Sequence, residues 1–207
     1  MRHIAAVNRS LKRLAMPALM MLVLAPGLSL LSGCEKTAEE KIAEHAVPVR
    51  SLGMPLDTFA TGFNRTMVEV LTDRKDDDPA HTARLYRLDA SRLHVGKQEK
   101  WLETTVGPAQ TSILASVDKA GELKAVGVLL TDRSQAAHEE FLLCAETSAR
   151  SFVTSADERG KLLSIINRLT GVALNNPGQR MTEVVGERLL SVEIVPQGLL
   201  FQVAQKQ

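Results

Sequence analysis

The chain has 207 residues, a net charge of +1 and 44% hydrophobic residues, which is enough for a folded core. Aromatic residues make up only 3% of the sequence, which argues against a stacking platform for bases or sugars. The near-neutral charge likewise disfavours nucleic acid as a partner.

The first 33 residues have the composition of an export signal. They contain no acidic residue and four basic ones: Arg2, Arg9, Lys12 and Arg13. A largely apolar run follows at residues 14–31, interrupted by Pro17 and Pro26. The prolines and the small residues at the end of the run favour a cleaved signal peptide at 1–33. The alternative is an uncleaved transmembrane anchor, for which the run is near the lower length limit.

The four residues at the end of this signal are Leu31-Ser32-Gly33-Cys34, and they resemble the lipobox of bacterial lipoproteins. The resemblance implies that Cys34 carries a thioether-linked diacylglycerol, becomes the new N-terminus and is acylated again, as with palmitate. Two or three chains would hold the protein on a membrane, since stable anchoring takes about two. An aspartate after the cysteine is the better-known signal for inner-membrane retention in such lipoproteins. Glu35 mimics it only in part, which favours the outer membrane, on its periplasmic face.

Cleavage before Cys34 would leave 174 residues with a net charge of about −3, because four basic residues are lost. Residues 34–51 are predicted to form a lipidated tether rich in Glu, Lys and Ala, followed by a single domain at 52–207. Lipid on Cys34 leaves Cys144 without an intramolecular disulfide partner.

Cys144 is set among apolar neighbours in the sequence 141–145, which predicts a small buried residue on the inner face of a helix. The alternative is a nucleophile paired with His138 or His94. His138 is six residues away, which on a helix places it off the face of the cysteine.

The mature domain is predicted to begin with a helix at Met54-Pro55-Leu56-Asp57, with proline at the first helical position and an acid in the first turn. Apolar residues then recur at spacings of three and four: Leu56, Phe59, Phe63, Met67 and Val70. Such a stripe indicates that these side chains belong to the hydrophobic core. A partner-binding face at Phe59, Phe63 and Met67 is the alternative. Gly62 indicates close packing against a neighbour.

Residues 73–79 are rich in aspartate, but they lack the spacing and glycine of a calcium loop, so we expect a solvated loop and no metal site. Five strands are predicted beyond it, at 85–88, 93–96, 101–106, 113–117 and 123–130, with a hairpin loop at 119–122. This segment is locally basic through Arg84, Arg87, Arg92, Lys97 and Lys100. The basic side chains indicate a solvated strand face or, alternatively, a surface for anionic headgroups or wall polymer.

Two helices are predicted next. Apolar or small residues recur at helical spacing at Ala137, Phe141, Cys144, Ser148 and Phe152. Asp132 and Gln135 could form a capping box before this helix, and Ser155 with Glu158 forms a better one before the next, predicted to end near Gly171. Strands at 181–185, 189–195 and 199–203 close the chain. We expect the last hairpin to pack with the first helix.

The order helix, strands, two helices, strands predicts an α+β fold, with three helices on one face of an antiparallel sheet. The sequence contains no nucleophile elbow, zinc-binding helix motif, phosphate loop or paired cysteines at metal spacing, so no catalytic residue, metal or cofactor is predicted. The leading expectation is a non-enzymatic, membrane-anchored accessory or scaffold protein that binds an envelope protein. An inhibitor or immunity-type lipoprotein and an envelope hydrolase are the alternatives.

Overall fold

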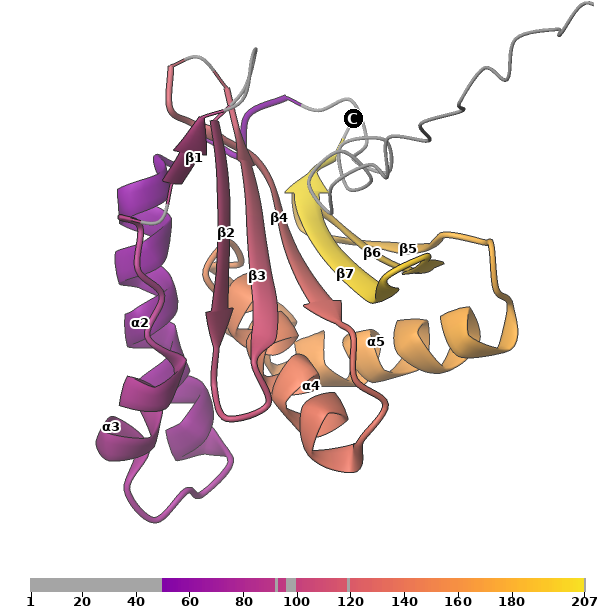
Figure 1. The fold of residues 1–207 in the computed structure, drawn as a ribbon, viewed down its shortest axis with the longest axis horizontal. Helices are drawn as coiled ribbons and strands as arrows, with labels where there is room; N and C mark the ends of the chain where they lie inside the picture. The colour runs from indigo at the N-terminus through magenta and orange to yellow at the C-terminus, as the bar shows by residue number, and fades with distance from the viewer. Residues whose placement is uncertain (1–49, 92, 96–99, 119, 207) are drawn as a thin grey trace, which may run out of the picture. The chain divides into compact units, whose positions relative to one another are not determined.

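The computed structural model describes residues 50–91, 93–95, 100–118 and 120–206, all within the unit Lys36–Gln207. Figure 1 shows their fold. The predicted signal peptide, Cys34 and most of the tether lie outside the described residues. In the described part, helices and one antiparallel sheet combine, and this confirms the α+β class.

The first described helix is α2, Leu56–Asp73. Pro55 is the N-cap rather than the first helical residue, with its backbone extended at φ −63° and ψ 152°. Asp57 lies in the first turn, where its carboxylate stabilises the positive end of the helix dipole. The predicted apolar stripe is buried at every position, with exposures of 0 to 7%: Leu56, Phe59, Phe63, Met67 and Val70.

The strand predicted at 85–88 is wrong, because helical turns occupy this part of the chain. They are α3, Pro79–Thr82, and the 3-10 helix η1, Ala83–Tyr86. The Asp78 carboxylate accepts a hydrogen bond from the His81 amide at 3.1 Å, and Pro79 presets the first helical φ. These local contacts stabilise the helical turns. Two short helical elements, α3 and η1, therefore lie between α2 and the first strand in the chain.

Seven strands form one sheet in the order β1-β2-β3-β4-β7-β6-β5, and every neighbouring pair is antiparallel. Their bounds are β1 Leu93–Val95, β2 Lys100–Val106, β3 Thr111–Val117, β4 Leu123–Leu130, β5 Met181–Val185, β6 Arg188–Val195 and β7 Gly198–Gln205. The sheet therefore consists of two meanders, β1–β4 and β5–β7, whose last strands pair in the middle (Figure 1). Helices precede each meander, but the first meander has four strands and the second has three.

The helices between the meanders are α4, Gln135–Arg150, and α5, Ala156–Asn175. Ser134 caps α4 and Ser155 caps α5, each accepting a backbone N–H three residues on, so the cap predicted at Asp132 lies two residues too early. The stop predicted near Gly171 is also wrong, since α5 continues for one more turn.

The described part contains four α-helices rather than the predicted three, and α4 and α5 pack directly on the sheet. α4 packs on β3, β4 and β7, α5 packs on β5 and β6, and α2 packs against α4. One continuous core results from alternate strand residues such as Ile113, Val126, Val192 and Phe201. A smaller buried cluster lies on the opposite face: Leu114, Leu129, Val195 and Leu200.

The closing hairpin and α2 contribute to the same core, and Phe152 lies between them. The Phe59 and Phe152 rings stack at 5.3 Å between centroids and 9° between planes. The guanidinium of Arg188, the first residue of β6, lies 5.8 Å from the Phe152 ring centroid. Among the described residues, α2 and the closing hairpin are thus connected through Phe152, which lies in the segment that joins α4 to α5.

Candidate functional site

The apolar stripe of α2 is interior. Phe59 and Phe63 are 0% exposed and Met67 is 1% exposed, so these three side chains are not accessible to a partner in this structure. They belong to the main core, in agreement with the expectation that the stripe is core. The solvent-exposed surface of α2 lies on the side of the helix opposite this stripe.

Cys144 is fully buried on the inner face of α4, as predicted. Burial raises the pKa of its thiol well above the ordinary value, and the Glu140 carboxylate raises it further. A thiol held neutral in this way is a poor nucleophile. His138 contacts the Phe141 ring, at 6.3 Å between centroids. The side chain of His94 lies outside the described part of the chain.

Of the basic segment, Arg84 and Arg87 are described, and both are exposed. They lie on η1 and just after it rather than on a strand. The side chains of Arg92, Lys97 and Lys100 lie outside the described residues. The proposed basic stripe on a strand face is therefore corrected for Arg84 and Arg87 and remains a prediction for the other three.

Two buried carboxylates on α4 were not anticipated. Glu146 is 2% exposed and accepts from Arg74 at 2.6 Å and Arg150 at 2.8 Å, joining α2 to α4. Glu140 is 5% exposed and accepts from the Ala109 and Thr111 amides at 3.0 and 3.1 Å, which fixes the β2–β3 turn. These charges position elements of the fold, since their acceptor oxygens are occupied by partners within the domain.

The strongest candidate for a binding site is an apolar groove where the main core reaches the surface. Leu130, Leu199 and Ile194 form one cross-strand row at the end of β4, β7 and β6. Leu130 and Ile194 are half-buried and pack against the core. Leu174, in the last turn of α5, lines the same hollow and is 54% exposed. The groove has a volume of about 630 Å³, and its lining exposes more apolar than polar surface.

A polar rim borders this groove along residues 131–135 and at His138. The Asp132 carboxylate accepts from the Ser134 amide at 3.0 Å and its hydroxyl at 2.9 Å, and these bonds lower the pKa of Asp132. The Ser134 hydroxyl in turn accepts from the Ala137 amide. At the other wall, Gly198 lies against the Leu130 carbonyl, where a Cβ would approach within 1.9 Å. The groove therefore has fixed walls.

A second hollow, of about 650 Å³, lies beside α2 and is polar. Asp57, Arg87 and Asp89 line it together with Asn64. Asn64 holds the wall in place, because its amide donates to the Leu88 carbonyl at 3.1 Å and accepts from the Leu88 amide at 2.8 Å. Charges of both signs over a short distance suit a polar contact surface.

No known protein family, curated protein or solved structure matches this chain. Among the described residues, no helix is both long enough and apolar enough to cross a membrane. Nor do three or more candidate metal ligands converge anywhere in the described ranges.

Proposed function

We propose that this chain is a lipid-anchored protein of the bacterial envelope whose folded domain binds another protein. Cys34 carries the lipid and attaches the domain to a membrane, for which the outer membrane, on its periplasmic face, is the favoured location. The domain acts as a non-enzymatic accessory or scaffold factor. The anchor rests on the sequence 31–34, and the binding role rests on the groove at the end of the sheet.

The observation that supports binding is the exposed Leu174 beside the row Leu130, Leu199 and Ile194. An aliphatic side chain left half in water beside an apolar hollow gains free energy when a partner covers it, about 25 cal/mol per Å² of apolar surface buried. A partner side chain of Leu or Phe size fits the hollow and would be the energetic centre of the contact. The rim at 131–135 supplies polar groups for its periphery.

The test uses the full chain in crosslinked envelopes, followed by affinity purification. We expect Leu174→Asp to reduce recovery of a stoichiometric partner at least about tenfold, because a carboxylate would be buried against the groove. Val172→Asp is the matched control, since Val172 is on the same helix, is 40% exposed and does not line the groove. Equal recovery with both variants, or no stoichiometric partner, would overturn the proposal.

The identity of the captured protein separates the two kinds of binder. A structural or assembly component of the envelope supports the accessory role. An enzyme whose activity falls when the purified chain is added supports the inhibitor or immunity-type role. Turnover of an envelope polymer by the purified chain alone would support the envelope hydrolase.

A further inference from the structure

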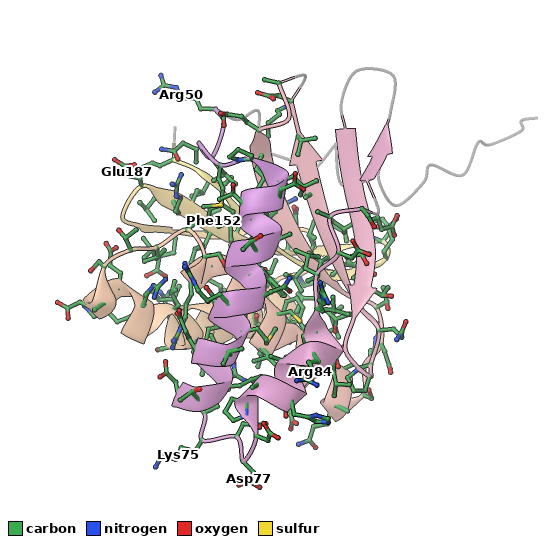
Figure 2. All side chains as sticks on the ribbon, turned by 90° about the vertical axis from the view of Figure 1, so that its left-hand side faces the viewer. Arg50, Lys75, Asp77, Arg84, Phe152 and Glu187 are labelled. Carbon is green, nitrogen blue, oxygen red and sulfur yellow. The ribbon has the colours of Figure 1, made fainter. Side chains whose placement is uncertain are left out.

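The outward side of α2 is uncovered by any described element. Figure 2 faces this side, and α2 lies at the front of the view. The outward positions recur at spacings of three and four, which forms one straight ridge: Thr58, Thr61, Arg65, Val68 and Thr72. Such a spacing is that of a helix that packs lengthwise against another helix.

Hollows lie on both sides of this ridge. The polar hollow of about 650 Å³ lies on one side, and a second of about 380 Å³, lined in part by Arg159, lies on the other. Asp57 and Thr61 line both hollows, so the ridge lies between them. A second helix packed along the ridge could place its flanking side chains in these two hollows.

The charges on the ridge are self-complementary. Asp57 and Arg65 are eight residues apart, roughly 12 Å along the axis. Asp57 has no ion pair within the described ranges, and the ion pair of Arg65 with Glu69 is long, at 3.9 Å, with 78% of the arginine side chain exposed. When two copies of α2 run antiparallel about Thr61, each Asp57 faces the Arg65 of the other copy.

Gly62 is consistent with such a contact. A Cβ built on Gly62 meets nothing within 4 Å, so the close packing expected at this glycine is not made by a described part of the same chain. Glycine inside a helix costs about 0.5–1 kcal/mol relative to alanine. Its lack of a side chain permits close approach by a helix from outside.

We propose that α2 is the interface of a homodimer, in which the helices of two copies pack antiparallel about a twofold axis at Thr61. Asp57 pairs with Arg65 of the second copy twice by symmetry. The contact is isologous and closes on itself, so it yields a dimer and not a filament.

Cysteine crosslinking of the full chain in the envelope tests the axis. Thr61→Cys places two thiols together at the axis, and we expect rapid intermolecular disulfide formation under mild oxidation. Thr72→Cys is the matched control, because it is also exposed on α2, but its two copies would be roughly 33 Å apart along the axis. The parent chain gives the background, since its Cys144 is buried. Crosslinking of Thr61→Cys no faster than Thr72→Cys would overturn the proposal.

Charge reversal gives a second, independent readout in the detergent-purified full chain, with mass measured by light scattering. Asp57→Arg or Arg65→Asp alone brings like charges together, and we expect each to raise the dimer dissociation constant at least about tenfold. The double variant restores opposite charges and should recover the dimer. A cooperative thermal unfolding transition in each of the three variants would show that they fold. A monomeric parent chain, or a double variant no more dimeric than the single ones, would contradict the proposal.

Discussion

Cys144 shows how burial changes the chemistry of a side chain. Its sequence neighbours predicted an interior position, and the structure places it at 0% exposure with a raised thiol pKa. In the unfolded chain the thiol regains its ordinary pKa of about 8.5, so above that pH the unfolded state binds fewer protons than the folded state. The contribution of Cys144 to stability is therefore intact below that pH and is lost as the pH rises.

We expect the free energy of unfolding of the parent chain to fall above about pH 8.5 by up to about 1.4 kcal/mol per pH unit more than that of Cys144→Ala. Chemical denaturation of both chains from pH 7 to 10 measures the difference. Tyr86, whose pKa burial and Glu140 raise to about 12, is present in both chains and cancels in the comparison. Parallel pH dependences of the two chains would mean that the thiol is accessible to solvent in the folded state.

The ion pair of Glu146 with Arg74 could not be predicted from the sequence. A glutamate usually lies on a solvated face, and its burial here depends on Arg74, which is 72 residues away in the chain. Local patterns carry no information about such a contact. The burial of Cys144 was predictable, in contrast, because its apolar neighbours are adjacent in the sequence.

Glu146→Gln should destabilise the domain by about 3 kcal/mol, since it leaves Arg150 and Arg74 without their shared carboxylate. The estimate is at the lower end for a buried pair because the Arg74 side chain is 32% exposed. Glu69→Gln is the control, because the ion pairs of Glu69 are more exposed and should be worth about 0–1 kcal/mol. Equal losses in urea denaturation would show that Glu146 is solvated.

At the scale of elements, the periodic segments were predictable and the short ones were not. The stripe of α2 and the cap at Ser155 gave correct helices, because each repeats or combines several local signals. The pattern at residues 85–88 predicted a strand because a short apolar run has no clear period. The Asp78 cap determined the helical outcome.

Phe63→Ala tests the packing of α2 against the rest of the core. The side chain is 0% exposed and its ring lies 5.9 Å from that of Phe59, so its removal should cost about 3–5 kcal/mol. Thr61→Ala, two residues earlier on the outward side, should change the free energy of unfolding by less than about 0.5 kcal/mol. A melting temperature unaffected by Phe63→Ala would place the stripe outside the core.

At the scale of the whole molecule, the pairing of β4 with β7 determines both the fold and the candidate groove. The two strands are 69 residues apart at Leu130↔Leu199, and two helices and two strands separate them in the chain. Sequence patterns predicted the strands of both meanders but not how the meanders join, because long-range pairing has no local signal. The groove was missed for the same reason, since its walls come from β4, β6, β7 and α5.

We expect the anchor and the domain to be separable, because the described residues already form an extensive core. Within them, every helix and strand follows Arg50, and the first buried core residue is Leu52. Lipid on Cys34 would therefore add membrane attachment without adding core packing. Stable attachment requires about two acyl chains, each methylene contributing about 0.8 kcal/mol when buried.

We accordingly expect Cys34→Ser to abolish metabolic labelling with palmitate and to shift the chain out of the membrane fraction, while its melting temperature stays within about 2 °C of the parent. Cys144→Ser is the matched control for labelling, since it removes the other cysteine and should leave lipid incorporation intact. Continued membrane association of Cys34→Ser without label would favour an uncleaved N-terminal span. A large fall in its melting temperature would instead show that the anchor segment contributes to the fold, and the groove would then have to be examined in the lipidated chain alone.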